Sequence, residues 1–180
     1  MQKKILIIST SLRPNANSEI LAHETEKGAK DSGHEVEFVT LKDKTIKFCK
    51  GCLACQKLGK CVIDDDANEI TNKMKNADVI IWATPVYYYE MSGQMKTLID
   101  RANSLFATGH KFKEVYLITT SAENSKGIIQ TVINGLNGWI ACLNGVKLCG
   151  YLEAGGLEEA NDAATKKDLL TQAYNMGKNL

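Results

Sequence analysis

The 180-residue sequence has only two prolines, three histidines and almost no net charge. A formal charge of +1 gives no electrostatic reason to expect binding to nucleic acid or to an anionic membrane surface. No apolar run approaches the roughly 20 residues needed to cross a bilayer, and the N-terminus lacks the features of a signal peptide. We therefore expect a cytoplasmic protein, in which the six cysteines are thiols or metal ligands rather than disulfides.

Glycine is absent from residues 9–18, Ser-Thr-Ser-Leu-Arg-Pro-Asn-Ala-Asn-Ser, which connect the first expected strand to the first expected helix. This excludes a Walker loop and a G-x-G-x-x-G dinucleotide motif. The segment is rich in polar side chains instead: Ser9, Thr10, Ser11, Arg13, Asn17 and Ser18. At a helix N-terminus, free N–H groups and the helix dipole attract anions, so this loop suits a phosphate monoester. The alternative is an ordinary turn in which Ser18 caps the helix.

Short apolar runs alternate with amphipathic segments along the whole chain. They predict strands at residues 4–9, 35–41, 79–84, 114–120 and 146–152, and helices at residues 18–31, 67–76, 92–104, 127–143 and 161–178. This alternation predicts one α/β domain over residues 1–180, with a doubly wound, five-stranded parallel sheet and helices on both faces. Such sheets bind ligands at the carboxyl ends of their strands. The connection at residues 42–66 is long, and loops of this length in compact domains usually have a function.

A second polar and aromatic loop follows the middle strand. Pro85 and Val86 give a rigid apolar edge, and Tyr87, Tyr88 and Tyr89 add flat, partly polar surfaces. These residues suit a planar heteroaromatic ring, although an aromatic loop that packs against a partner subunit is an alternative. Together with the phosphate loop, they predict a site for a phosphorylated ring cofactor.

These two loops resemble motifs of the NAD(P)H-dependent FMN reductase family of flavodoxin-like proteins. Residues 10–18 are similar to its G-S-x-R-x-x-x-N-[ST] phosphate loop, and residues 84–101 to its [ST]-P-x-Y…S-G-x-x-K…D-R segment. The resemblance covers about residues 3–125 and implies a flavodoxin-like fold with non-covalently bound FMN. It implies that the phosphate is held by Ser11, Arg13, Asn17 and Ser18, and that the isoalloxazine is lined by Pro85, Val86, Tyr87 and Tyr88. Ser121, in the loop at residues 120–124, would touch the other edge of the ring. Thr10 departs from the family pattern, which has glycine there, and residues 120–124 also lack glycine.

The long connection carries four of the six cysteines, Cys49, Cys52, Cys55 and Cys61, in a C-x2-C-x2-C-x5-C pattern. Zinc sites usually pair two short hooks across a longer insert, whereas successive x2 steps resemble ferredoxin-type ligation of a [4Fe–4S] cluster. Iron–sulfur flavoproteins, which are relatives of the FMN reductases, carry a compact motif of this kind. A cluster, free or redox-active thiols, and zinc stay open as alternatives. The other cysteines, Cys142 and Cys149, are expected to be packing residues.

The predicted function is an FMN oxidoreductase. NAD(P)H would deliver hydride to the flavin, which would reduce a small-molecule acceptor: a quinone, an azo or nitro compound, or a flavin. The cofactor carries this chemistry, so no catalytic side chain is predicted. One alternative is an iron–sulfur flavoprotein that passes single electrons through a [4Fe–4S] cluster to a redox protein, and another is a non-catalytic flavin-binding module. The family resemblance also implies a homodimer or homotetramer.

Overall fold

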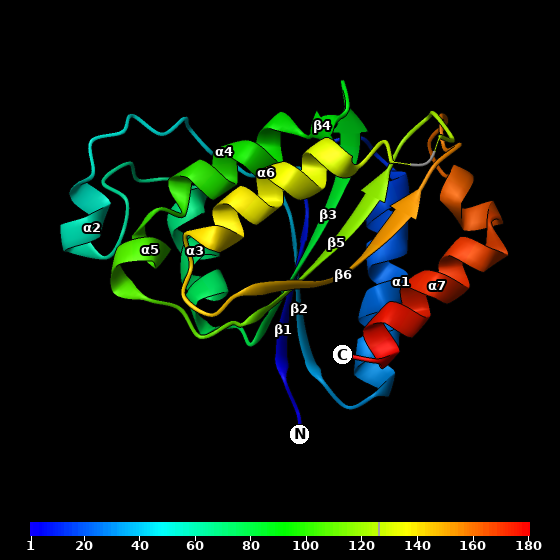
Figure 1. Ribbon diagram of the computed structural model, residues 1–180, viewed down its shortest axis with the longest axis horizontal. Coiled ribbons are helices and arrows are strands. Elements are labelled where there is room, and N and C mark those ends of the chain that lie inside the picture. The colour runs from blue at the N-terminus through cyan, green and yellow to red at the C-terminus, as the bar shows by residue number, and fades with distance from the viewer. Residues whose placement is uncertain (126) are drawn as a thin grey trace.

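The computed structural model describes residues 1–125 and 127–180. Its main sheet is parallel, with strand order β2-β1-β3-β5-β6, as in flavodoxin-like folds (Figure 1). The strands are β1 (Lys4–Ser9), β2 (Glu35–Thr40), β3 (Val79–Tyr87), β5 (Glu114–Thr120) and β6 (Lys147–Ala154). The predicted doubly wound α/β fold is therefore confirmed.

Helices cover both faces of the sheet (Figure 1). One face carries α1 (Asn17–Asp31) and α7 (Lys167–Lys178), and the other carries α3 (Asp66–Asn76), α4 (Gly93–Arg101) and α6 (Gln130–Ala141). Two short helices, α2 (Ala54–Leu58) and α5 (Ser104–Thr108), lie beside each other at the outer edge of the second layer. None of the helices within the described ranges is long and apolar enough to cross a membrane.

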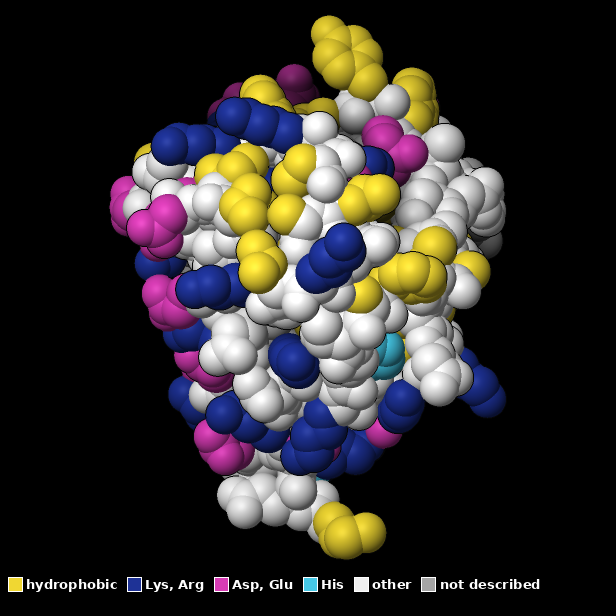
Figure 2. Space-filling view, turned by 90° about the vertical axis from the view of Figure 1, so that its left-hand side faces the viewer, with side chains coloured by type: hydrophobic (Ala, Val, Ile, Leu, Met, Phe, Trp, Pro, Cys, Tyr) yellow, Lys and Arg dark blue, Asp and Glu magenta, His cyan; other side chains and the backbone are white. Residues whose placement is uncertain are grey.

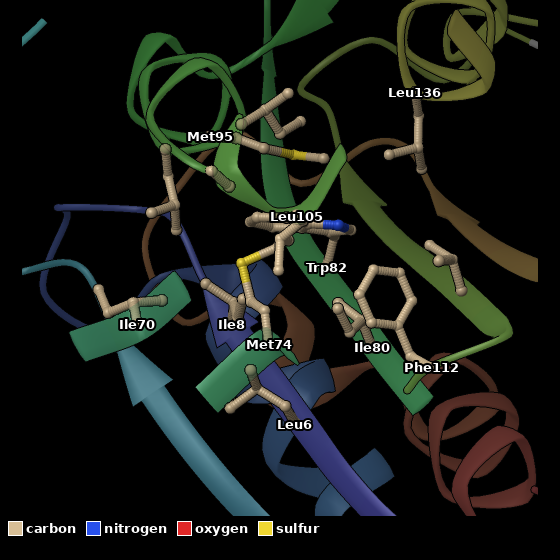
Figure 3. Close-up of a cluster of buried hydrophobic side chains, with 14 of the residues drawn as sticks. Leu6, Ile8, Ile70, Met74, Ile80, Trp82, Met95, Leu105, Phe112 and Leu136 are labelled. Carbon is tan, nitrogen blue, oxygen red and sulfur yellow. The ribbon is translucent and has the colours of Figure 1, made fainter. Parts of the chain in front are cut away.

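The first strand shows how the sequence builds two cores. Side chains alternate between the faces of a strand, and every residue from Ile5 to Ile8 is apolar and buried. Ile5 and Ile7 pack toward α1 and α7, whereas Leu6 and Ile8 belong to the cluster on the opposite face. Figure 3 shows that second cluster, in which Trp82 of β3 lies among side chains from the strands and the covering helices. A strand that is buried on both faces has no polar alternation, which is why β1 reads as a continuous apolar run.

Backbone contact between α1 and α7 depends on two glycines. A methyl group on Gly28 would collide with the carbonyl oxygen of Tyr174, and one on Gly177 would collide with the carbonyl oxygen of Thr25. The Thr25 hydroxyl also donates to the Ala173 carbonyl oxygen across this contact, at 2.9 Å. The close approach fixes α1, and with it the loop that precedes α1, against the C-terminal helix.

Several elements differ from the sequence prediction. β3 continues to Tyr87 and reverses through Tyr88 and Tyr89 into β4 (Glu90–Met91), which pairs antiparallel with it. Both turn tyrosines have positive φ, 50° and 64°, where glycine or asparagine is the usual signal, so the hairpin was not predictable from composition. The helix predicted at residues 161–178 is divided into a 3-10 turn (Asp162–Thr165) and α7, after Asn161 at φ 72°. The helix predicted at residues 92–104 ends at Arg101.

Candidate functional site

Three loops meet at the carboxyl edge of the sheet, at the top of Figure 1. Strand register places Ser9 of β1 beside Ala83 of β3, and Pro85 of β3 beside Thr120 of β5. The loops that follow these strands therefore lie next to one another, as the sequence predicts. The edge between β1 and β3 is also where the strand order reverses, the position at which open α/β sheets bind ligands.

The loop between β1 and α1 holds an unused hydrogen-bonding group. The Ser18 hydroxyl is buried in the first turn of α1 and has no hydrogen-bond partner among the described residues. The residue that precedes the helix is Ala16, which offers no side-chain cap, so Ser18 is not the cap that the alternative interpretation required. Ser11 is also buried, at 3 % exposure, and its Oγ accepts the N–H of Arg13 at 3.3 Å. An orphaned hydroxyl and uncapped helix N–H groups are donors that suit a phosphate.

Arg13 and Asn17 contact the segment between β6 and α7. The Arg13 guanidinium donates to the Glu158 carbonyl oxygen at 2.8 Å and to the Glu159 carboxylate at 3.2 Å. The Asn17 amide donates to the Glu159 carbonyl oxygen at 2.8 Å, and its oxygen accepts the N–H of Ala163 at 3.0 Å. These two side chains thus fix residues 157–163 beside the phosphate loop. The Ser9 hydroxyl donates to Glu19 at 3.4 Å, within the start of α1.

A buried hydroxyl network joins the first loop to the second. The Thr10 hydroxyl donates to the Ala83 carbonyl oxygen at 3.1 Å and lies 3.0 Å from the Ser92 hydroxyl. The N–H of Ser92 donates to the Thr84 hydroxyl at 3.1 Å, and Ser92 caps α4 by accepting the N–H of Met95 at 3.3 Å. This network was not predicted from the sequence. It accounts for threonine at position 10, where the side chain ties the loop to β3.

The aromatic loop presents its tyrosines to solvent. Pro85 and Val86 are half-buried, whereas Tyr88 is fully exposed at the tip of the β3–β4 hairpin. The Tyr89 hydroxyl donates to the Glu123 carboxylate at 2.9 Å, and this hydrogen bond, with the carboxylate charge, raises the pKa of Tyr89. The Ser121 hydroxyl donates to the Glu123 carbonyl oxygen at 2.8 Å. Glu123 therefore links the hairpin to the loop that follows β5.

The four motif cysteines line one pocket of about 720 Å³, here called the cysteine pocket. It lies between the long connection and the helices α4 and α6, so Trp139 and Cys142 also line it. Cys55 is buried, Cys61 is half-buried, and Cys49 and Cys52 are exposed. Cys142 and Cys149 are exposed as well, so the prediction that they are packing residues is wrong: Cys142 follows the last residue of α6, and Cys149 lies in the edge strand β6.

The donor chemistry of the cysteine pocket fits an iron–sulfur or zinc site. Cysteine thiols are ligands that both metals prefer, and all four cysteines line the same space. In the described part of the chain, their side chains are not gathered into a group of three or more metal ligands. Metal ligation therefore stays a prediction, which this shared pocket supports.

Arg101 holds both ends of the cysteine-bearing connection. Its side chain is 0 % exposed, and that of Asp65 is 2 % exposed. Nη1 and Nη2 each donate to Asp65, at 2.6 and 2.9 Å, and also to the carbonyl oxygens of Lys47 at 2.7 Å and Ile63 at 3.0 Å. The remaining donor, Nε, points to the sulfur of Cys61 at 3.3 Å. All five guanidinium donors are thus used.

Asp65 completes this buried pair. It accepts the N–H groups of Lys47 at 2.9 Å and Ala67 at 3.1 Å, which makes it the N-cap of α3. Burial acts to raise the pKa of Asp65, but the hydrogen bonds from Arg101 and from these two backbone groups outweigh it and lower the pKa. The sequence predicted only that a helix follows at residues 67–76. It gave Arg101 no role beyond its match to the family motif, because the partners of Arg101 lie 36 to 54 residues away.

Exposed apolar side chains gather around the cysteine-bearing connection. Figure 2 looks onto the side of the molecule that carries α2 and α5, where hydrophobic groups lie among lysines and arginines. The large exposed hydrophobic residues in this region are Phe48, Leu53, Leu58, Val62 and Phe106. Their number distinguishes this side from a wholly polar surface.

Comparison with known families gives a match over most of the chain. The family described as NADPH-dependent FMN reductase matches residues 3–140. An iron–sulfur flavoprotein of Methanosarcina thermophila is 35 % identical over 138 residues, which cover 76 % of this chain and 72 % of that protein. An iron–sulfur flavoprotein of Methanocaldococcus jannaschii is 44 % identical over 102 residues, which cover 57 % of this chain and 53 % of the relative. The chain thus spans about half the length of the first curated relatives that it matches.

Solved structures share the fold at low sequence identity. An NAD(P)H:quinone oxidoreductase from Methanothermobacter marburgensis superposes with a TM-score of 0.76 and 14 % identity, covering 99 % of this chain and 97 % of the other. An azoreductase from Bacillus anthracis gives a TM-score of 0.75 and 14 % identity, covering 99 % of this chain and all of the other. At this identity, the likeness establishes the architecture alone.

Proposed function

Because the chain belongs to the NADPH-dependent FMN reductase family, we propose that it is an oxidoreductase that holds FMN at the carboxyl edge of its sheet. Bound FMN would supply the redox chemistry, by accepting reducing equivalents from NAD(P)H and passing them to an acceptor. A quinone, an azo or nitro compound, or a free flavin suits a two-electron donor of this kind. The quinone oxidoreductase and azoreductase activities named for the structural neighbours support these acceptor classes.

The chain contributes position and charge to this site. Ser11, Ser18 and the first N–H groups of α1 would bind the phosphate, and Arg13 would add positive charge beside it. Pro85, Val86, Tyr87 and Tyr88 would line the ring on one side, and Ser121 would lie on the other. The Thr10–Ser92 contact keeps the phosphate and ring loops in a fixed relation to each other.

A second function is favoured by the cysteine pocket. We propose that Cys49, Cys52, Cys55 and Cys61 hold a [4Fe–4S] cluster, which would let the protein deliver single electrons to a redox partner. Two observations support this: the four cysteines line one pocket, and two curated relatives that are 44 % and 35 % identical to this chain are named iron–sulfur flavoproteins. The nearby Lys47, Lys50, Lys57 and Lys60 would offset part of the negative charge of a cluster.

The observation that carries the FMN proposal is the unpartnered, buried Ser18 hydroxyl. Ser18→Ala should weaken FMN binding tenfold or more, since a hydrogen bond to a charged group contributes about 1.5–3 kcal/mol. The same change should leave the stability of the cofactor-free protein equal or higher, because it removes a buried polar group that has no partner. Fluorescence titration of the cofactor-free protein with FMN, together with urea unfolding, checks both effects.

Riboflavin and Thr71→Val are the controls. Riboflavin lacks the phosphate, so its affinity should be the same for wild type and Ser18→Ala. Thr71 in α3 has a second buried hydroxyl with no partner among the described residues, so Thr71→Val removes a matched group from a helix away from the carboxyl edge. Equal losses of FMN and riboflavin affinity in Ser18→Ala, or an equal loss of FMN affinity in Thr71→Val, would contradict the phosphate assignment.

A further inference from the structure

Two side chains at the C-terminal end of α4 direct N–H groups to cysteine sulfurs. Arg101 Nε donates to Cys61 Sγ at 3.3 Å, and Asn103 Nδ2 donates to Cys55 Sγ at 3.4 Å. Arg101 and Cys61 lie 40 residues apart in the sequence, and Asn103 and Cys55 lie 48 residues apart. These contacts therefore come from the tertiary fold and not from the cysteine motif itself.

The two sulfurs that receive these bonds are the less exposed ones. Cys55 is buried and Cys61 is half-buried, whereas Cys49 and Cys52 are exposed. Hydrogen bonds in a poorly solvated environment are electrostatically stronger than the same bonds in water. Arg101 and Asn103 thus donate to the two sulfurs at which a hydrogen bond has the largest electrostatic effect.

The Arg101 contact is a hydrogen bond rather than an unbalanced charge. Both Nη groups are bound to the Asp65 carboxylate, so the pair as a whole is close to neutral. Asn103 is uncharged. Its side chain does not cap α5, which starts at the next residue, so its described contact with Cys55 is separate from helix capping.

We infer that Arg101 and Asn103 are positioning residues that raise the reduction potential of a [4Fe–4S] cluster in the cysteine pocket. This inference rests on the proposed cluster. Reduction adds one electron, and hence one negative charge, to a cluster and its thiolates. N–H donors stabilise the more negative form more strongly, and hydrogen bonds to the sulfurs are among the determinants of cluster potential.

The test compares midpoint potentials of the full chain after anaerobic reconstitution with iron and sulfide. Asn103→Ala removes one donor and should lower the midpoint potential by up to about 59 mV. For one electron, this equals an increase of up to about tenfold in the oxidised-to-reduced ratio at a fixed potential. Asn103→Asp replaces the donor with a negative charge and should lower the potential further. Electron paramagnetic resonance of the reduced samples reports whether the cluster type is unchanged.

Asn68→Ala is the matched control. Asn68 bonds to the backbone of Cys61 and Ile63, and among the described residues its side chain makes no hydrogen bond to a sulfur, so its loss loosens the same loop without removing an N–H···S bond. The midpoint potential of the cluster in Asn68→Ala should match that in wild type. An unchanged potential in both Asn103 variants, or an equal shift in Asn68→Ala, overturns the inference while the cluster stands. A wild-type chain that takes up no iron and sulfide overturns the proposed cluster, and this inference with it.

Discussion

At the scale of single residues, the Asp65–Arg101 pair is the ion pair whose loss should lower stability most. Both side chains are almost fully buried, and together they contact Lys47, Cys61 and Ile63. Breaking a buried ion pair by removing one partner leaves a charge without compensation, which commonly costs about 3–5 kcal/mol. Surface pairs contribute about 0–1 kcal/mol. The ion pairs among the described residues are therefore far from equal in their effect on stability.

Asp65→Asn should lower the free energy of unfolding at pH 7 by about 3 kcal/mol. The pKa of Asp65 is lowered in the folded state, so its contribution is present above the pKa of the unfolded chain and is lost as pH falls through the folded value. The difference between wild type and variant should therefore narrow on acidification. Urea unfolding at pH 7 and at successive acidic values measures it. Asp100→Asn, which removes an exposed pair with Lys96, serves as the control and should cost under about 1 kcal/mol at pH 7. A wild-type-to-Asp65→Asn difference that is constant with pH would refute this role.

At the scale of elements, the packing of α1 on α7 depends on two residues without side chains. Gly177→Ala should lower the free energy of unfolding by about 2–3 kcal/mol, because the added methyl meets the Thr25 carbonyl oxygen and the helices must separate. Gly138→Ala in α6 has open space around the new methyl and should raise stability by about 0.5–1 kcal/mol through helix propensity. Thermal and urea unfolding compare the two. Similar changes in both variants would show that backbone contact is not the cause.

The elements also show where sequence reasoning succeeds. The apolar runs predicted β1 and β5 with the bounds that the structure has, Lys4–Ser9 and Glu114–Thr120, because a central strand is apolar on both faces. The β3–β4 hairpin was missed, since Tyr88 and Tyr89 carry no turn signal. The roles of Gly28 and Gly177 were missed for a different reason. In a sequence, a glycine within a helix indicates only lower propensity, and the partner helix lies almost 150 residues away.

At the scale of the whole molecule, two candidate sites occupy different regions. The loops that follow β1 and β3 lie at the carboxyl edge of the sheet, whereas residues of α2 and α5 line the cysteine pocket. Figure 1 shows these two helices at the outer edge of the helix layer, away from the tips of the strands. Candidate residues for both sites could be proposed from the sequence, because hydroxyl-rich and cysteine-rich segments are visible locally, and their binding roles stay predictions. The sequence did not predict the contacts of Arg101, Asn103 or Thr10, since each one requires two segments that only folding brings together.

Separate sites predict separable losses. Cys52→Ser should abolish uptake of about four irons and four sulfides per chain during anaerobic reconstitution, while FMN binds with wild-type stoichiometry. Cys149→Ser, at an exposed cysteine outside the motif, should load like wild type. Iron and sulfide analysis, with flavin absorbance on the same samples, provides the measurement. Loss of FMN together with the cluster, or normal loading of Cys52→Ser, would count against two independent sites.

The contacts of Arg101 also bear on how this protein can change during evolution. Arg101 binds the chain at Lys47, before the four cysteines, and at residues 61–65, after the first three of them. These two anchor points do not depend on the residues between them. For a flexible loop with fixed ends, each doubling of length costs only about 0.6 kcal/mol in closure entropy. Residues 48–60 thus form an insert between two fixed anchors, and from within it Cys55 contacts Asn103. We expect that a change in the length of this insert, including loss of the cysteine motif, would leave the sheet and the loops at its carboxyl edge in place.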